Sequence, residues 1–490
     1  MIEPPLNCGG SMRIEGRKTM LKKVMTRYGE VEGIISDGGF ALFKGIPYAA
    51  PPIGELRWKP SVAPRPWDGV LKCDTWGAAC IQDTPHADPS ASYGKEYYSG
   101  DDYPPKMSED CLYLNIWTPA ETGTEKLPVM MWMHGGGVQS GYSHEIEFDG
   151  DAICSRGVIL VTINYRLNIF GYFAHPELSV ENEFGASGNY GVHDQLQALR
   201  WIHENIEAFG GDPDNVTVFG QSGGGRSTQA LSCSPFAKGL FRRAIVQSAG
   251  GIHTALGRLP REVMENRGVE FMKFAGCKNI SELRAIPAEK LFALFLEYGS
   301  GPDPMSLIHK GFNISTGGFA LPLSLEDALI EGKQLDLDYL LGCTTGDSRM
   351  GPMLESLMGW AQLQQEHGLK PAYLYRFEHS LPVDDPNDDR VLKGAFHSSE
   401  LWYVFGTLDR CWRPMTDGDR ELSRIMLDCW TNFAKTGDPN GSTVPEWRTY
   451  DNAAPELMRF DTADNGGCGM ISIDSDGELR ASVKKLMGRS

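Results

Sequence analysis

Residues 217–229 read TVFGQSGGGRSTQ, in which four glycines stand within six positions around Ser222. Glycine weakens both strands and helices, so such a cluster beside an apolar run needs a local reason. The stretch fits the pattern G-x-S-x-G from Gly220 to Gly224, with a predicted strand before it and a predicted helix after it. A serine at so sharp a turn takes unusual backbone angles, and the chain folds back tightly only where its neighbours lack side chains. We therefore interpret the glycines as clearing space around an exposed nucleophile, Ser222.

A second glycine cluster lies upstream, where Gly135, Gly136 and Gly137 follow His134 and the apolar run PVMMWM. Acyl transfer passes through a tetrahedral oxyanion, and backbone N–H groups are suitable donors to hold it. We expect the amides of Gly136, Gly137 and Gly223 to form such an oxyanion hole. A plain turn is the alternative for this cluster.

Strand-like and helix-like segments alternate along the chain, which is typical of helices packed on a mostly parallel sheet. The clearest helix lies within residues 194–211, where apolar residues recur every three or four positions and two glycines follow. The predicted strands include the runs LPVMMWM, VILVTI, DNVTVFG, RRAIVQ, DYLLGC and AYLYRF. The fold class is therefore α/β.

Composition excludes several classes of function. The chain has 490 residues, of which 41% are apolar, and its formal net charge is −18. An acidic chain is poorly suited to bind phosphate backbones or anionic membranes, so no nucleic-acid or membrane partner is expected. No apolar run approaches the roughly 18 residues needed to cross a bilayer.

The cysteines and the amino terminus indicate a cytoplasmic protein without a metal. The 11 cysteines include no CxxC pair and no metal-ligand spacing, so neither a metal nor another cofactor is expected. The amino-terminal residues are partly basic but lack the apolar region of a secretory signal. We expect residues 1–24 to form a loose extension and residues 25–490 to form a single catalytic domain.

Four segments resemble type-B carboxylesterases, the cholinesterase and carboxylesterase group of the α/β-hydrolase superfamily. They are SEDCLYLNIWTP (108–119), MHGGGVQSG (133–141), GNYGVHDQLQALRWIHENIEAFGGDPDNVTVFGQSGGG (188–225) and GAFHSSELWYVFG (394–406). The resemblance runs from about residue 28 to the carboxyl terminus. It implies an α/β-hydrolase fold, with a mostly parallel central sheet flanked by helices, and a serine esterase.

A serine nucleophile needs a base, and in this superfamily the chain order is Ser, then Asp or Glu, then His. Only His367, His379 and His397 come late enough. His367 lies in a helical segment before a strand, and His379 is better interpreted as a structural or rim residue. His397 stands in GAFH, followed by Glu400, which resembles the family's histidine motif. His397 is therefore the expected base, and the resemblance suggests a structural ion pair for Glu400.

The third member should follow the strand DYLLGC at its carboxyl end. Asp336 and Asp338 precede this strand, whereas Asp347 follows it. Relatives usually place a glutamate in this slot, and Asp347 is one methylene shorter. We expect Asp347 to orient the imidazole of His397.

Several residues depart from the resemblance. Gln221 stands where relatives carry glutamate, which makes charging of the histidine less favourable. Arg226 either meets an anionic part of a substrate or is solvated or salt-bridged. Cys80 and Cys111 resemble the loop-closing pair of secreted relatives, and their oxidation state is left open.

The predicted site is wide. Only 24 residues separate Asp347 from Ala372, enough for one helix and two short connections, so the helical lid is reduced. Val138 stands where relatives often have phenylalanine, which further widens the space near the oxyanion hole. The loop 81–110 lacks tryptophan, which disfavours choline esters.

These observations predict a carboxylic-ester hydrolase that works through an acyl-enzyme on a small-molecule ester. Short-chain and bulky or aromatic esters, including hydroxycinnamoyl (feruloyl) esters, are expected, and long-chain triglycerides are expected to be poor substrates. The alternatives are a non-catalytic binding protein of cholinesterase-like fold and an amidase or lactonase of the same fold.

Overall fold

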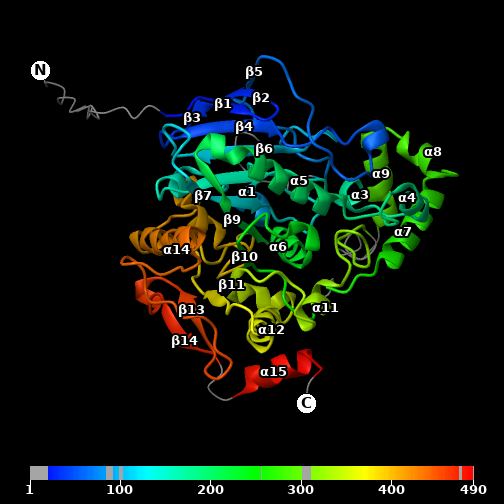
Figure 1. Ribbon diagram of the computed structural model, residues 1–490. Helices are drawn as coiled ribbons and strands as arrows, with labels where there is room; N and C mark the ends of the chain where they lie inside the picture. Colours follow the sequence, from blue (N-terminus) through cyan, green and yellow to red (C-terminus); the bar gives the residue numbers. More distant parts are fainter. Residues whose placement is uncertain are drawn as a thin grey trace, which may run out of the picture.

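A computed structural model describes residues 20–83, 92–98, 103–254, 257–300, 311–473 and 477–488. Figure 1 shows a large twisted sheet with helices against both faces. In the described part of the chain this sheet has 11 strands, in the order β14-β13-β12-β11-β10-β9-β7-β8-β6-β4-β3. A small sheet of β1, β2 and β5 lies beside one end of it.

The strands are β1 (Lys23–Thr26), β2 (Gly29–Glu32), β3 (Ile34–Ile35), β4 (Ala41–Pro47), β5 (Val70–Lys72), β6 (Tyr113–Thr118), β7 (Leu127–Met133), β8 (Ile159–Ile163), β9 (Gly211–Gln221), β10 (Arg243–Gln247), β11 (Asp338–Thr344), β12 (Tyr373–Phe377), β13 (Glu456–Phe460) and β14 (Gly469–Ser472).

The α-helices are α1 (Ser92–Tyr97), α2 (Asp151–Cys154), α3 (Asn168–Tyr172), α4 (Pro176–Glu181), α5 (Tyr190–Asn205), α6 (Gly223–Cys233), α7 (Arg261–Phe274), α8 (Ile280–Arg284), α9 (Ala288–Gly299), α11 (Leu325–Ile330), α12 (Met353–Glu366), α13 (Leu401–Phe405), α14 (Asp417–Thr436) and α15 (Glu478–Leu486). The short 3-10 helices are η1 (Gly54–Leu56), η2 (Ile206–Phe209), η3 (Pro235–Ala237), η4 (Thr345–Met350), η5 (Leu408–Arg410) and η6 (Ala463–Asn465).

The central strands of the large sheet are parallel. Every pairing from β8 through β7, β9, β10, β11 and β12 to β13 is parallel, whereas the pairings toward β3 and β14 at the two edges are antiparallel. Parallel neighbours need a crossover, and here the crossovers include α2, α5, α6 and α12. The predicted α/β class with a mostly parallel sheet is confirmed.

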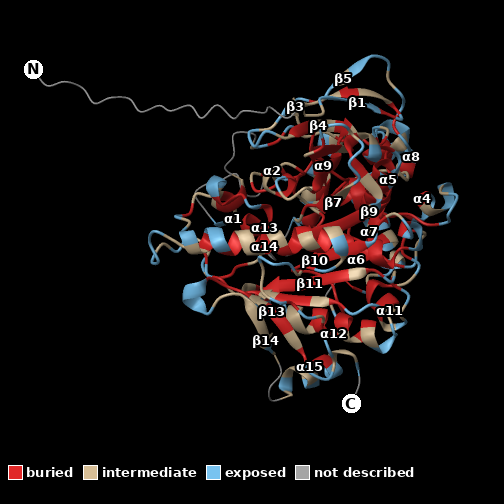
Figure 2. Ribbon diagram, turned by 60° about the vertical axis from the view of Figure 1, so that its left-hand side comes forward, coloured by how far each residue is buried: buried red, intermediate tan, exposed pale blue. Residues whose placement is uncertain are grey.

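Two apolar cores lie on opposite faces of the sheet because side chains alternate along each strand. In β7, Val129, Met131 and Met133 belong to one core, whereas Met130 and Trp132 belong to the other. The first core also takes residues of α5, α6 and α12, and the second takes residues of α2, α13 and α14. Figure 2 shows the strands largely buried between these layers.

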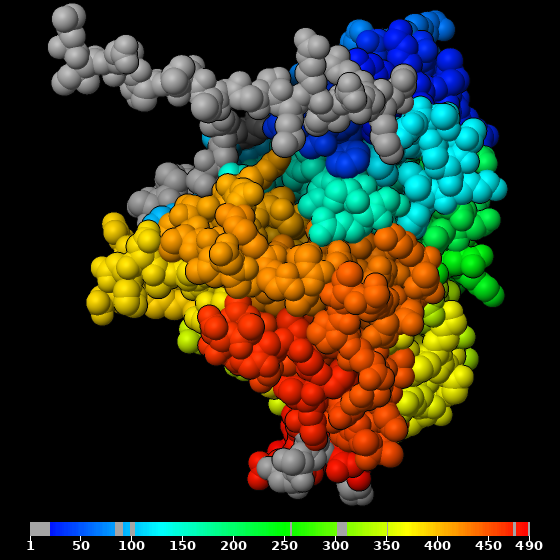
Figure 3. Space-filling view, turned by 90° about the vertical axis from the view of Figure 1, so that its left-hand side faces the viewer, coloured from blue at the N-terminus to red at the C-terminus, as the bar shows by residue number. Residues whose placement is uncertain are grey.

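One face of the molecule is built largely by the last third of the chain. In Figure 3 the orange segment that contains α14 lies between the cyan part of the chain above it and the red carboxyl-terminal strands below it. The amphipathic α14 places Leu422, Met426 and Phe433 in the second core. Its last turn is followed by Gly437 in the left-handed conformation, φ 85°, which ends the helix.

Most predicted elements form as expected, with corrections near the amino terminus. The helix expected within residues 194–211 is α5 followed by η2, and Gly210 ends it with φ 82°. The expected extension 1–24 is too long, because β1 begins at Lys23 and pairs with β2. Residues 1–19 of that extension, and residues 84–91 and 99–102 of the loop 81–110, lie outside the described residues.

Within the described ranges, none of the helices has both the length and the apolar character needed to cross a bilayer. The cytoplasmic location stays a prediction.

Candidate active site

Ser222 stands at the turn between β9 and α6, at the centre of the sheet. Its backbone angles are φ 55° and ψ −120°, which are costly for a residue with a side chain. The turn is held by two backbone bonds: Ser222 N–H donates to Gln247 O at 2.9 Å, and Arg226 N–H donates to Ser222 O at 2.9 Å. A strained serine between a strand and a helix is the geometry predicted from G-x-S-x-G.

The glycines around Ser222 are required by close backbone contacts. A Cβ on Gly220 would lie 2.5 Å from the backbone of Gly224, and one on Gly224 would lie 1.9 Å from the carbonyl oxygen of Met133. A Cβ on Gly225 would lie 2.8 Å from Gln247 O. The interpretation that these glycines clear space for the turn is confirmed.

The first turn of α6 approaches the loop after β7. A Cβ on Gly223 would lie 2.8 Å from the backbone nitrogens of Gly137 and Val138, so only glycine permits this approach. Gly136 and Gly137 are left-handed, with φ 87° and 63°. Within the described part of the chain, the N–H groups of Gly136, Gly137 and Gly223 donate to no acceptor. The residues expected to hold an oxyanion therefore lie together, with their amides available.

Val138 does not widen the site in the way expected. Its side chain is fully buried in the first core, and its backbone is left-handed with φ 59°. Open space lies instead at Gly137, where a Cβ would meet no atom within 4 Å.

His397 and Asp347 meet at the carboxyl edge of the sheet. Asp347 lies in η4, directly after β11, and His397 lies in the loop between β12 and α13. His397 Nδ1 lies 2.6 Å from Asp347 Oδ1, and Thr344 N–H donates to Asp347 Oδ2 at 2.8 Å. Burial opposes ionisation of Asp347, but the hydrogen bond and charge of His397 outweigh it and lower the pKa of this carboxyl.

The other two aspartates considered lie far from this pair in the fold. Asp338 forms an ion pair with Lys370 at 2.9 Å, and Asp336 accepts a hydrogen bond from the backbone N–H of Lys370. Both stand before or at the start of β11, at the opposite end of the strand from Asp347.

Gln221 contacts the imidazole from the other side. Its amide Nε2 lies 3.2 Å from His397 Nε2, and His397 lies beside the residue that precedes Ser222. Among the described residues no hydrogen bond joins the Ser222 hydroxyl to His397; such bonds are often long before substrate binds. With Nδ1–H directed to Asp347, the Nε2 of a neutral imidazole is left as an acceptor.

Glu400 forms no ion pair with any of the described residues, so the interpretation drawn from the family resemblance is wrong here. Its carboxylate is fully buried, and its contacts are weak hydrogen bonds at 3.4 Å from Gln247 and Ser248. Burial, together with the nearby charge of Asp347, raises the pKa of Glu400 to about 7. Gln247 and Ser248, at the carboxyl end of β10, were missed from the sequence, although polar residues where a parallel strand ends are a known signal.

The remaining late histidines are structural. His379 is buried between two carboxylates, with Nε2 at 2.7 Å from Asp419 and Nδ1 at 3.1 Å from Asp461. His367 follows α12, is exposed, and places Nε2 at 3.0 Å from Ile330 O. The structure therefore brings only His397 of these three to Asp347.

Cys80 and Cys111 are both buried free thiols. The other buried cysteines of the described residues are free thiols as well. The backbone N–H of Leu167 lies 3.3 Å from Cys80 Sγ. A hydrogen bond with Cys80 and burial raise the pKa of the Cys111 thiol, so the Cys111 sulfur is held as a neutral thiol.

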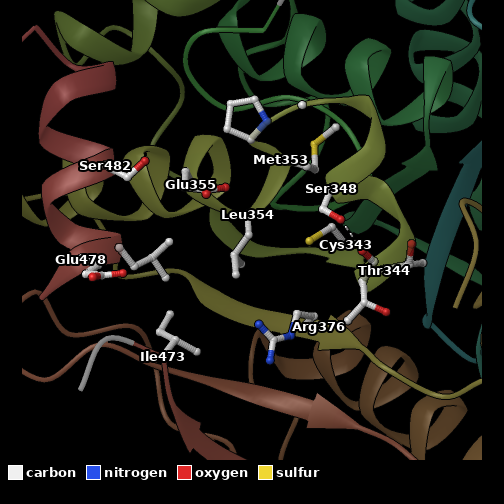
Figure 4. Close-up of a pocket in the computed structure, with 14 residues that line it drawn as sticks. Cys343, Thr344, Ser348, Met353, Leu354, Glu355, Arg376, Ile473, Glu478 and Ser482 are labelled. Atoms are coloured by element: carbon white, nitrogen blue, oxygen red, sulfur yellow. Dashed lines mark hydrogen bonds between the residues drawn. The ribbon is translucent and has the colours of Figure 1, made fainter. Parts of the chain in front are cut away.

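The reduced helical segment after Asp347 is confirmed, because residues 345–366 form only η4 and α12 before β12. A cavity of about 780 Å³ lies between η4, α12, β12 and α15. Figure 4 shows Arg376 reaching into it from β12 and Glu478 bordering it from α15. Thr345 and Ser348 line this cavity, whereas Asp347 lies toward His397.

The sequence matches the model of the carboxylesterase family over residues 21–356 and 350–474. The chain belongs to the carboxylesterase family. As a member it is a carboxylic-ester hydrolase. It is 34% identical to a para-nitrobenzyl esterase of Bacillus subtilis (strain 168), over 94% of this chain and 98% of the relative. It is also 32% identical to a fumonisin B1 esterase of Sphingopyxis macrogoltabida, over 91% of this chain and 87% of the relative.

Solved structures of carboxylesterases share the fold. A thermophilic para-nitrobenzyl esterase superposes with a TM-score of 0.80 at 29% identity, covering 94% of this chain and 99% of that chain. A carboxylesterase of Geobacillus stearothermophilus superposes with a TM-score of 0.77 at 30% identity, covering 94% of this chain and 100% of that chain. The α/β-hydrolase fold is thereby confirmed.

Proposed function

We propose that this carboxylesterase cleaves its ester through an acyl-enzyme on Ser222, with His397 as base and Asp347 as its orienting acid. The observation that carries the proposal is the 2.6 Å contact between the buried Asp347 and His397 beside the strained Ser222 turn. Serine is a poor nucleophile by itself, and this arrangement supplies both a base and a group that holds the base in one tautomer.

In the proposed reaction, Ser222 Oγ bonds to the ester carbonyl carbon while His397 Nε2 accepts the hydroxyl proton. The amides of Gly136, Gly137 and Gly223 donate to the carbonyl oxygen as it becomes negative. The bond to the alcohol then breaks, and His397 returns the proton to the leaving oxygen. A water molecule repeats the same steps on the acyl-enzyme and releases the acid.

Before attack, the Gln221 amide must move away from His397 Nε2 or share it with Ser222. Its 3.2 Å contact is weaker than a charge-assisted bond, so this rearrangement is cheap. Gln221 is uncharged, whereas relatives carry glutamate at this position. In the described structure His397 therefore has one buried acid, Asp347, as its charged hydrogen-bond partner.

We also propose that short-chain and bulky or aromatic esters, including hydroxycinnamoyl esters, are accepted, and that long-chain esters are poor. Two features support it: η4 and α12 alone stand between Asp347 and β12, and the space in front of Gly137 is open. A site with fewer walls buries less of a long alkyl chain and gains less per methylene.

The proposed nucleophile is tested with Ser222→Ala and a fluorophosphonate probe. Wild type should be labelled at Ser222 and should hydrolyse p-nitrophenyl butyrate, whereas Ser222→Ala should be unlabelled and lose nearly all activity. The matched control is Ser155→Ala, an exposed serine on the segment after α2. Circular dichroism melting checks that both variants are folded, and labelling of the Ser222→Ala protein would exclude the assignment.

A further inference from the structure

Arg226 lies one helical turn from Ser222 and has no acidic partner in the described part of the chain. Its backbone N–H donates to Ser222 O at 2.9 Å, and four helical residues advance the chain by about 6 Å. Ser222 directly precedes α6, and Arg226 lies in the first turn of this helix. Both residues therefore stand at the amino-terminal end of α6, next to the proposed reacting centre.

The surroundings of Arg226 do not neutralise it. Its Nη2 donates to the neutral oxygen Oδ1 of Asn313, and its Nε is covered without a hydrogen-bond partner. Among the described residues, no carboxylate lies within 4 Å of the Arg226 guanidinium, which is the distance of an ion pair. Burial lowers the pKa of Arg226 to about 10, while Tyr172 and Tyr165 oppose this, so the guanidinium stays charged at neutral pH.

A charge without a partner is costly at a largely buried position such as that of Arg226. If Arg226 served only to bridge α6 to Asn313, an uncharged amide would do so at lower cost. The side chain also keeps some exposed surface, although its Nε is covered. A partly exposed arginine with N–H donors beyond the one that binds Asn313 matches a planar carboxylate of a ligand.

The position of Arg226 indicates which part of an ester would carry that carboxylate. Asn313 follows Phe312, whose carbonyl oxygen accepts a hydrogen bond from Gln139 Nε2 at 2.8 Å. Gln139 belongs to the glycine loop after β7, so Arg226 lies on the side of the expected oxyanion hole. His397, by contrast, contacts Gln221 and Asp347 and not, among the described residues, those that link Arg226 to the glycine loop. The leaving alcohol must lie next to the proton donor, which leaves the acyl part for the Arg226 side.

We propose that Arg226 binds a carboxylate in the acyl part of the substrate, so that the enzyme prefers half-esters of dicarboxylic acids. The proposal rests on the proposed acyl-enzyme at Ser222. It makes Arg226 a specificity-determining residue that touches the substrate. Esters with a neutral acyl chain of the same shape would leave the guanidinium unpaired and would bind less well.

The test compares monoethyl succinate, glutarate and adipate with the corresponding ethyl ester amides, which replace the carboxylate by a neutral group of the same shape. Release of ethanol gives kcat/KM for each ester. Wild type should favour at least one half-ester over its amide by tenfold or more. Arg226→Met should lower that ratio at least tenfold, and Arg226→Lys should retain part of it. Arg242→Met, at an exposed arginine, should leave the ratio unchanged.

Two results would overturn the proposal. The first is a wild-type ratio near one for every chain length. The second is a ratio that is equal in wild type and in a folded Arg226→Met protein; an equal loss of kcat/KM on both kinds of ester would give this result and would make Arg226 a structural or oxyanion-stabilising residue. Absence of hydrolysis of any ester, p-nitrophenyl butyrate included, would instead contradict the acyl-enzyme on Ser222.

Discussion

Asp347→Asn is the substitution that best separates the proposed triad from a merely similar arrangement. The asparagine would be isosteric, so packing in this fully buried place is kept. Thr344 N–H donates to the Oδ2 position at 2.8 Å, which forces the new amide to keep its oxygen there. The NH2 group must then face His397 Nδ1, where the aspartate has an acceptor at 2.6 Å.

The forced orientation reverses the tautomer of His397. A donor opposite Nδ1 requires Nδ1 to accept, so the proton moves to Nε2, the atom that must take the proton of Ser222. The corresponding change in serine proteases lowers kcat about 10⁴-fold. We expect a loss of about 10³- to 10⁴-fold here, which is about 4 to 5.5 kcal/mol in the activation free energy.

The assay is the initial rate with p-nitrophenyl butyrate, together with urea unfolding to show that the variant is folded. Asp336→Asn is the matched control, because Asp336 is exposed before β11 and should leave kcat unchanged. Asp347→Glu keeps an acceptor and should lose less than Asp347→Asn. Activity of Asp347→Asn within about tenfold of wild type, a difference of roughly 1.4 kcal/mol, would refute the reasoning and assign the orienting role to another group.

Three further predictions concern stability and substrate size. Because burial raises the pKa of Glu400 to about 7, the folded protein keeps a proton between about pH 4.5 and 7 that the unfolded chain releases, and stability falls as the pH rises through this range. Glu400→Gln removes this titration. The free energy of unfolding of the variant minus that of wild type should therefore be larger at pH 8 than at pH 5 by about 3 kcal/mol. An equal difference at both pH values in urea unfolding would contradict this prediction. Gly224→Ala places a Cβ 1.9 Å from Met133 O and should destabilise the fold by about 3 kcal/mol or more. The control is Gly469→Ala, whose Cβ would meet no atom within 4 Å, and it should be nearly neutral. A wild-type urea midpoint for Gly224→Ala would show that the turn can relax. Finally, kcat/KM should be higher for p-nitrophenyl butyrate than for p-nitrophenyl palmitate, with methyl ferulate turned over; a preference for palmitate would show an enclosed site.

The turn around Ser222 was readable from the sequence because its cause is local. A left-handed serine between a strand and a helix needs neighbours without Cβ atoms, and that requirement is written in adjacent positions. The alternation of strands and helices is local in the same sense, so the parallel sheet also followed. His397 was predicted as the base from a short motif and Asp347 as the acid from its place after a strand, and both predictions used the chain order of a family.

Only the tertiary structure decided the electrostatic state of the residues around this turn. Glu400 was expected in an ion pair, but the segments that surround it supply Gln247 and Ser248 in place of a cation. Arg226 was left between a salt bridge and a substrate contact, and the residue that meets it, Asn313, lies 87 positions away. Backbone conformation is set by near neighbours, whereas the charge of a buried group depends on burial and on partners from distant segments. Sequence therefore determined where the proposed nucleophile stands, and the fold determined which charges around it are left unpaired.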